Sequence, residues 1–316
     1  MTTPRDFYAS GALSRRMELS VVVPTLNARD ELSGCLDALA RCTPDAETVV
    51  VNGPSADGTT GMIQNRDDVD VLVEVADRTI NAARNAGVDH ATGDAIAFVD
   101  HTLCISEGWA AAVAERLEEF DAVTGPTNIQ LRAGMVTEEV ESRTIAGREV
   151  IYFNGGNVAF RRDPLAELDG FDEYLDIGGA RDFAHRLAAS DYDVTWDDRM
   201  SVRREVGADG GEHETDWGWK YRSLAYRLLK NYGLRPTVLR RLCSHAGGDA
   251  VSELRDVFGG ENRPSAWLGD GRDVVANLLR GTADGLVARR LDRTVRRNPY
   301  GRSARTDRAV SVYDWR

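Results

Sequence analysis

The first hundred residues of the chain alternate between short apolar runs and segments in which apolar residues recur at helical spacing. The runs predict β-strands, because they are short and rich in valine and isoleucine. The predicted strands span residues 18–23, 47–51, 69–75 and 94–99, and the helices between them span residues 30–40, 59–65 and 79–91. Strands that alternate with helices predict an α/β fold built on a parallel sheet with crossover helices.

The pattern becomes less regular in the second part of the chain. Strands are predicted at residues 122–127, 152–160 and 194–196, and helices at residues 109–119, from 161 onward and at 181–189. From Trp217 onward the pattern is helical, with apolar stripes that predict packed helices. Residues 1–17 are polar and predict a flexible leader, and the last twenty residues predict a basic loop.

Polar turn residues follow three of the predicted strands. These segments are Pro24–Asn27, Asn52–Asp57 and Asp100–Thr102. The carboxyl ends of parallel strands share one edge of a sheet, and ligands of such sheets bind beyond that edge. The three segments are therefore expected to form one binding site.

The composition is acidic and poor in lysine. The formal net charge is -12, and Lys220 and Lys230 are the only lysines among 39 basic residues. Salt screens the self-repulsion of an acidic surface, so a halophilic source is inferred; codon bias toward arginine is the alternative reading. The same balance argues against nucleic acid as a partner, since a basic face would be expected. No apolar run has the length of a membrane-spanning helix, and the N-terminus does not resemble a secretion signal.

The four cysteines match no zinc-binding or redox spacing. They are therefore predicted to be buried free thiols. A disulfide between Cys35 and Cys42 is the less favoured alternative, because such bonds are rare in the cytosol.

Six motifs, in the expected order, resemble those of a family-2 glycosyltransferase with the GT-A fold. They are Val21–Asn27 (VVVPTLN), Asn52–Thr59 (NGPSADGT), Ala82–Gly87 (AARNAG), Ala91–Asp100 (ATGDAIAFVD), Asn154–Arg162 (NGGNVAFRR) and Gly170–Glu173 (GFDE). The resemblance covers about residues 18 to 200. A later segment, Trp267–Asp273, is similar to haloarchaeal glycosyltransferases of glycoprotein assembly.

The resemblance implies an architecture and a reaction. It implies a mixed, mostly parallel sheet flanked by helices, in a GT-A catalytic domain over residues 18–205. Residues 18–103 would form the nucleotide-sugar half and residues 104–205 the acceptor half, followed by a helical, arginine-rich region over 206–316. The implied reaction is inverting transfer of a hexose or hexuronic acid from a UDP- or GDP-linked sugar to a dolichyl- or polyprenyl-phosphate-linked glycan. The pyrophosphate leaving group then calls for a divalent metal, Mg²⁺ or Mn²⁺.

The resemblance also assigns residues to the site. The donor-binding residues are Pro24, Thr25, Asn27, Asn52, Ser55, Asp57, Arg84, Asn85 and Asp100. The acceptor-side residues are Asn154, Gly155, Gly156 and Arg161. Asp100 and His101 are the candidate metal ligands.

The chain departs from the family pattern at two donor-side positions. The Asp-x-Asp metal motif is replaced by Asp100-His101-Thr102, so only the first acid is present. The acid that commonly follows the second strand is replaced by Asn52, and Asp57 in the same turn is its candidate substitute. Asp57 is equally expected to cap the following helix.

The third departure concerns the catalytic base. The family's Glu-Asp pair aligns with Gly179-Ala180, so the usual base is missing. Asp176 and Asp182 are the nearest acids and the two candidates for catalysis. The alternative is a catalytically degenerate GT-A homologue that binds another glycosyltransferase.

Basic residues gather near the end of an otherwise acidic chain. Residues 280–297 predict an amphipathic basic helix that lies on an anionic bilayer. A cytoplasmic protein attached peripherally to the inner face of the membrane is therefore expected. The alternative is a helix docked on the catalytic domain with a solvated basic face.

Overall fold

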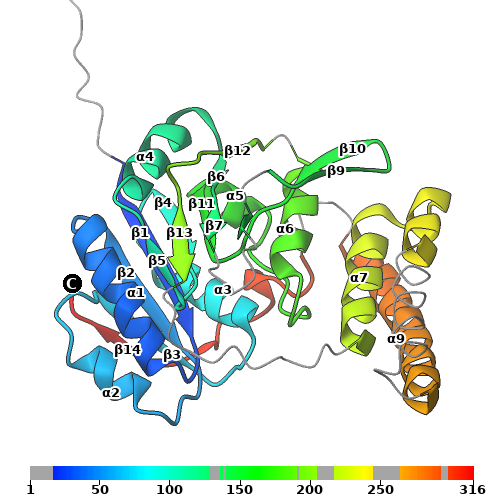
Figure 1. Ribbon diagram of the computed structural model, residues 1–316, viewed down its shortest axis with the longest axis horizontal. Helices are drawn as coiled ribbons and strands as arrows, with labels where there is room; N and C mark the ends of the chain where they lie inside the picture. Colours follow the sequence, from blue (N-terminus) through cyan, green and yellow to red (C-terminus); the bar gives the residue numbers. More distant parts are fainter. Residues whose placement is uncertain are drawn as a thin grey trace, which may run out of the picture.

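The fold is built around an eight-stranded mixed sheet (Figure 1). The computed structural model describes residues 17–128, 136–137, 140–190, 192–204, 217–244, 264–292 and 298–316, so the predicted leader lies almost wholly outside it. In spatial order the strands are β12 (Val194–Trp196), β6 (Ala122–Thr124), β11 (Asn157–Arg161), β4 (Ala95–Val99), β1 (Leu19–Thr25), β2 (Glu47–Asn52), β3 (Val71–Val75) and β14 (Ala309–Asp314). Strands β4, β1, β2 and β3 run parallel, as do β12 and β6, whereas β11 and β14 are antiparallel to their neighbours. The predicted mixed, mostly parallel sheet is confirmed.

Helices cover both faces of this sheet, as an α/β fold requires. One face carries α1 (Arg29–Cys42), α2 (Thr59–Gln64) and α4 (Trp109–Glu119), and the other carries α3 (Ile80–His90), α5 (Arg162–Glu167) and α6 (Gly179–Leu187). Successive residues of a strand point to opposite faces. Thus Val21 and Val23 pack in the core with α1, whereas Val22 packs in the core with α3.

Helix α3 lies unusually close to the sheet. Its residues from Asn81 to Val88 are all buried. A Cβ at Gly87 would lie 2.3 Å from Val22 Cγ1, so the glycine of the AARNAG motif permits this approach. The motif is therefore explained first by packing.

A helical pair stands at one end of the molecule, beside a β-hairpin (Figure 1). The pair consists of α7 (Trp217–Tyr232) and α9 (Pro264–Leu291), and the hairpin of β9 (Ser142–Ile145) and β10 (Arg148–Ile151). Residues 236–244 form a further helix. A smaller sheet joins β5 (Leu103–Ile105), β13 (Val202–Arg204), β7 (Thr127–Asn128) and β8 (Val136–Thr137). No helix in the described ranges is both long and apolar enough to cross a membrane.

The C-terminal prediction was wrong. The last residues do not form a loop: Ala309–Asp314 forms β14, which pairs antiparallel with β3 at the edge of the large sheet. The arginines before it pair with acids of the sheet domain, as Arg308 does with Glu173 and Arg302 with Asp89. Part of the basic C-terminus therefore holds the sheet edge.

The strand predicted over residues 152–160 begins five residues later than expected, at Asn157. Strand β10 ends at Ile151 and β11 begins at Asn157. Between them the side chain of Asn154 accepts a hydrogen bond from the Gly156 N–H at 2.9 Å, which closes a tight turn. Asparagine and glycine favour such turns over an extended strand. The four cysteines form no disulfide, as predicted. The predicted burial is confirmed for Cys35 and Cys104, but Cys42 is partly exposed and Cys243 is exposed.

Candidate functional site

The predicted edge is formed by two interlocked turns after β1 and β2. Asn27 has a positive φ of 49°, and its side-chain oxygen accepts a hydrogen bond from the Ala56 N–H at 2.7 Å. The Asn27 N–H donates to Ser55 Oγ at 2.8 Å, and Ser55 Oγ donates to Asn52 Oδ1 at 2.7 Å. The structure thus brings together three of the predicted donor-binding residues, which shape a polar rim.

Two residues of these turns that were predicted to bind the donor substrate stabilise the turns and helices instead. Asn52 is 1% exposed, and its side-chain nitrogen donates to Thr60 Oγ1 at 2.9 Å. Asp57 accepts hydrogen bonds from the backbone N–H groups of Arg29 and Thr59 at 3.1 Å each. The hydroxyl of Thr59, followed by these N–H groups, lowers the pKa of Asp57. The N-cap residue of α2 is Gly58 and not Asp57. Asp57 instead bonds the first N–H group of α1 and of α2, and so ties both helices to the rim.

Asp100 stands at the end of β4, next to this rim. Its Oδ1 accepts hydrogen bonds from the backbone N–H of Thr102 at 2.9 Å and from Thr102 Oγ1 at 2.6 Å. The side chain is 28% exposed. Burial raises the pKa of Asp100, but the neighbouring His101 and the Thr102 hydrogen bonds outweigh it, so the pKa is lowered overall. Asp100 is therefore an oriented carboxylate that solvent reaches.

The turn before β11 is pressed against Asp100. The Asp100 N–H donates to the Gly156 carbonyl at 3.0 Å. A Cβ at Gly156 would lie 2.6 Å from Asp100 Cβ, and a Cβ at Gly155 would lie 2.6 Å from an Arg84 nitrogen. These approaches require glycine at both positions. Asn154, Gly155 and Gly156 thus lie beside the donor edge, as predicted.

Arg84 supports the site from beneath. It is 6% exposed, and its guanidinium donates to the Gly155 carbonyl at 2.8 Å and to Asn81 Oδ1 at 3.1 Å. Burial lowers the pKa of Arg84 to about 10, with a smaller opposing effect of Asp100. Arg84 therefore stays charged near neutral pH and places positive charge under the turn.

The structure corrects the assignment of Asn85 to the residues that bind the donor substrate. It is fully buried, and its side-chain amide bonds both the N–H and the carbonyl of Phe171, at 2.8 and 2.9 Å. One helical turn earlier, Asn81 donates to the carbonyl of Asp172 at 3.1 Å. The two asparagines, whose i, i+4 spacing places them on one face of α3, hold the segment that leads to Asp176. Sequence reasoning missed Asn81.

The structure also corrects the assignment of Arg161 to the acceptor side. In the sheet register it lies opposite Ala95, which begins β4, so it is at the far edge from Asp100. Its guanidinium donates to the carbonyls of Leu117 and Glu118 at the C-terminus of α4, at 2.7 and 2.6 Å. A cation there stabilises the helix end. Arg161 does not contribute to the acceptor side.

The missing acid pair falls on the first turn of α6. A Cβ at Gly179 would lie 2.2 Å from Asn81 Nδ2, so glycine is needed there. The Cβ of Ala180 lies 3.0 Å from the position of a Cβ at Gly155, beside the turn. The site described so far therefore has a methyl group where the resemblance implies an acid.

Of the two candidate bases, only Asp176 is solvent-accessible. Its side chain is exposed, but the neighbouring protein atoms remove part of the water around the carboxyl. This partial desolvation raises the pKa of Asp176, and the charge of Arg222 opposes the increase. Asp182 is 0% exposed and is bonded by Arg186 at 2.8 Å and Lys230 at 3.1 Å. A buried carboxylate saturated with cations cannot accept a substrate proton, so Asp182 is a structural residue and this prediction is corrected.

The metal ligands form no preassembled centre. No group of three or more histidine, cysteine or acidic residues in the described chain is arranged to hold a metal ion. His101 Nδ1 faces the Pro24 carbonyl at 3.2 Å, so Nε2 is the ring nitrogen that could bind a metal. Asp100, as an oriented carboxylate, suits the mode in which a divalent ion takes one or two protein ligands and completes its shell with substrate phosphates. The His101 nitrogen that lies 3.9 Å from Asp100 Oδ1 is Nδ1, so the structure does not place Nε2 beside the carboxylate.

The sequence of this chain is similar to those of known glycosyltransferases. Residues 20–168 match the family model described as glycosyl transferase family 2. Glycosyltransferase AglE of Haloferax volcanii is 27% identical over 157 residues, covering 48% of this chain and 45% of AglE. A PGL/p-HBAD biosynthesis glycosyltransferase of Mycobacterium tuberculosis is 36% identical over 85 residues, covering 25% of this chain and 33% of the relative. The chain thus spans less than half of the length of each of these two relatives.

Two solved structures share the fold across most of the chain. The mannosyltransferase PcManGT of Pyrobaculum calidifontis, in complex with GDP-Man and Mn²⁺, has a TM-score of 0.54 at 18% identity, covering 86% of this chain and 88% of PcManGT. S. aureus TarS 1–349, in complex with UDP-GlcNAc, has a TM-score of 0.61 at 16% identity, covering 87% and 90%. The predicted GT-A fold is confirmed.

Proposed function

We propose that this protein, whose residues 20–168 match the family model described as glycosyl transferase family 2, transfers a hexose or hexuronic acid from a UDP- or GDP-linked sugar to a dolichyl- or polyprenyl-phosphate-linked glycan. The observation that carries the proposal is the edge where Asp100 meets the interlocked turns and the glycine turn. Glycoprotein assembly in a halophilic archaeon is the proposed setting. It is supported by the net charge of -12 and by the similarity to a Haloferax protein.

The proposed mechanism assigns the donor to this edge. The nucleotide would lie against the rim made by Asn27 and Ser55, with its diphosphate toward Asp100. A Mg²⁺ or Mn²⁺ ion held by Asp100 and His101 would neutralise the departing diphosphate. Arg84 would add positive charge beneath the glycine turn. The acceptor hydroxyl would attack the sugar from the opposite side, which inverts the anomeric centre.

We assign deprotonation of the acceptor to Asp176. The segment before it is anchored by Asn81, whose side chain also donates to the Leu175 carbonyl at 2.5 Å. A carboxyl with a raised pKa is a better proton acceptor than an ordinary aspartate. The methyl group of Ala180 favours the second candidate function, a non-catalytic homologue that binds a partner glycosyltransferase.

Transfer assays distinguish the two functions. With labelled UDP- and GDP-sugars and prenyl-phosphate-linked acceptors in molar salt, the wild type is expected to form product, and EDTA is expected to stop it. Asp176→Asn is expected to lower kcat about a hundredfold, because it removes the proton acceptor. An Asp198→Asn variant changes an acid outside the proposed site and serves as the control. No product with any donor, together with retained binding of a partner enzyme, would establish the second function.

The outer face of α9 supports attachment to a membrane. Four apolar residues on it are 55–62% exposed, namely Val275, Leu279, Val287 and Leu291. They recur at multiples of four residues, and Arg280 and Arg290 are exposed among them. Apolar side chains flanked by arginine suit the interface of an anionic bilayer. We therefore propose peripheral attachment on the cytoplasmic face through α9.

Co-sedimentation with phosphatidylglycerol vesicles tests this attachment. The wild type is expected to bind in molar salt, because burial of apolar surface is not screened. A Leu279→Glu/Val287→Glu double variant should bind at least about tenfold more weakly, since it places charges in the interface. Val310→Glu alters a valine on β14 that is 69% exposed and should bind like the wild type. Equal binding by all three proteins would exclude α9 as the membrane contact.

A further inference from the structure

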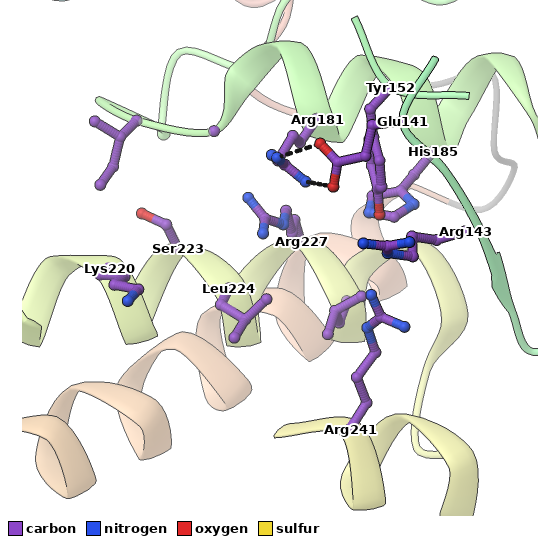
Figure 2. A pocket seen from close by; sticks show the side chains of 13 residues that line it. Glu141, Arg143, Tyr152, Arg181, His185, Lys220, Ser223, Leu224, Arg227 and Arg241 are labelled. Atoms are coloured by element: carbon purple, nitrogen blue, oxygen red, sulfur yellow. Dashed lines mark hydrogen bonds and ion pairs between the residues drawn. The ribbon is translucent and has the colours of Figure 1, made fainter. Parts of the chain in front are cut away.

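A cavity lies between α6, α7 and the β9–β10 hairpin (Figure 2). Its volume is about 400 Å³. Tyr152, Ile177 and Arg181 line it. Along the chain, Tyr152 lies two residues before Asn154, Ile177 follows Asp176, and Arg181 follows Ala180. The cavity therefore borders the acceptor side of the proposed reaction centre.

The lining of this cavity is strongly cationic. The basic residues are Arg143, Arg181, Lys220, Arg227 and Arg241. The acid in the lining is Glu141, and both of its carboxylate oxygens bond Arg181, at 2.8 and 3.2 Å. In Figure 2, Arg143, Arg227 and Arg241 reach the same space from the hairpin, from α7 and from the helix over residues 236–244. The Glu141 carboxylate thus balances one cation and leaves an excess of positive charge.

Arg227 is the most constrained of these cations. Its Nε is buried and has no hydrogen-bond partner in the described part of the chain. Burial, and then the neighbouring charge of Arg181, lowers the pKa of Arg227 to about 10. Removing a charged donor from water without a partner is costly, so this guanidinium gains from an added anion.

Two neutral side chains add unused hydrogen-bonding atoms. Ser223 is 2% exposed, and its Oγ has no partner among the described residues. His185 is 0% exposed; its Nδ1 lies 2.9 Å from Tyr232 Oη, whereas its Nε2 has no partner in the same set. Burial lowers the pKa of His185 to about 3, so the ring is neutral and Nε2 can carry a proton. Hydroxyl, imidazole and guanidinium together offer donors from several directions.

We infer that this cavity binds the phosphate group of the acceptor substrate. A phosphate presents several acceptor oxygens and one to two negative charges, which match forked arginines from separate elements better than a single carboxylate would. A neighbouring hollow shares Arg143 and Arg241 and adds Arg235 and Arg240, so the positive field extends away from the site. The inference deepens the proposed function, on which its assignment to the acceptor rests.

Direct binding tests the site without requiring catalysis. Calorimetry with the full chain would use a short prenyl phosphate, the matching prenyl alcohol and inorganic phosphate. The prenyl phosphate is expected to bind, and the alcohol is not. Arg227→Gln, and separately the double variant Arg143→Gln/Arg241→Gln, should weaken binding about tenfold or more. Arg143 is exposed and Arg241 is half-buried. The pair keeps the test valid if Arg227→Gln fails to fold.

Arg41→Gln makes the same change at an exposed residue at the end of α1 and should bind like the wild type. In transfer assays the pocket variants should raise the acceptor KM and leave the donor KM unchanged. Binding without any transfer would refute the proposed function and keep the phosphate site. Transfer with an unchanged acceptor KM would refute the site and keep the function. Inorganic phosphate binding as tightly as prenyl phosphate would overturn the assignment to the acceptor.

Discussion

An Asp100→Asn variant is expected to transfer sugar about a hundred- to a thousandfold more slowly than the wild type while folding normally. Asparagine keeps an oxygen that can accept the two hydrogen bonds of Thr102, so the turn after β4 should persist. It lacks the negative charge that would hold a divalent ion against the donor diphosphate. The loss should therefore appear in kcat/KM and in metal dependence, with the melting temperature preserved.

Asp94→Asn provides a matched control. Asp94 immediately precedes β4, as Asp100 immediately follows it, so the two acids stand at opposite edges of the sheet. Asp94 accepts a hydrogen bond from the Glu18 N–H at 3.2 Å, a bond that asparagine can also accept. Its activity should match the wild type. Full activity of Asp100→Asn at saturating and limiting metal would remove Asp100 from the site.

Replacing Lys230 with methionine is expected to lower the free energy of unfolding by about 3–5 kcal/mol. The Lys230 ammonium is 1% exposed and lies between two buried carboxylates, Asp172 and Asp182. Arg186 also bonds Asp182, and Tyr226 Oη donates to Asp172 at 2.8 Å. Without the lysine, Asp172 would lose the only ion pair that it makes among the described residues while remaining buried. Urea denaturation followed by circular dichroism measures this loss.

Lys220→Met is the control, because the chain has only these two lysines and both lie on α7. Lys220 is more exposed than Lys230 and lines the cationic cavity, and its ammonium lies 5.8 Å from the centre of the Tyr221 ring. Its variant should differ from the wild type by less than about 1 kcal/mol. Equal destabilisation by the two variants would show that general packing of α7, and not the ion cluster, supplies the stability.

The same cluster predicts an acid-sensitive fold. Burial raises the pKa of Asp182, but Lys230 and Arg186 outweigh it and hold the pKa well below its usual value. Its stabilising contribution is complete above the pKa of an unfolded aspartate, about 4, and is lost as the pH falls through the lower folded value. The urea midpoint of the wild type should therefore decline below about pH 4. Lys230→Met should decline less steeply, because Asp182 then has one fewer cation holding its pKa down.

Part of the site was predictable because it depends on local sequence. Each parallel strand ends in a polar turn, so Asn27, Ser55 and Asp100 were placed on one edge from their positions in the chain. The sequence showed Gly155 and Gly156 as part of a motif, but it did not show why glycine occupies these two positions. Their reason is the contact with Arg84 and Asp100, which comes from distant segments.

The sequence by itself determined the alternation of strands and helices, the shared edge and the absence of the acid pair at Gly179-Ala180. These features follow from residue periodicity and register, which are local. Only the tertiary structure decided which polar residues are free to react. Asp182 is bonded by Lys230, 48 residues away, and Asn85 by Phe171, 86 residues away. Whether a carboxylate or an amide meets solvent or a buried partner depends on such long-range neighbours, and β14, which pairs with a strand more than two hundred residues earlier, depends on them in the same way.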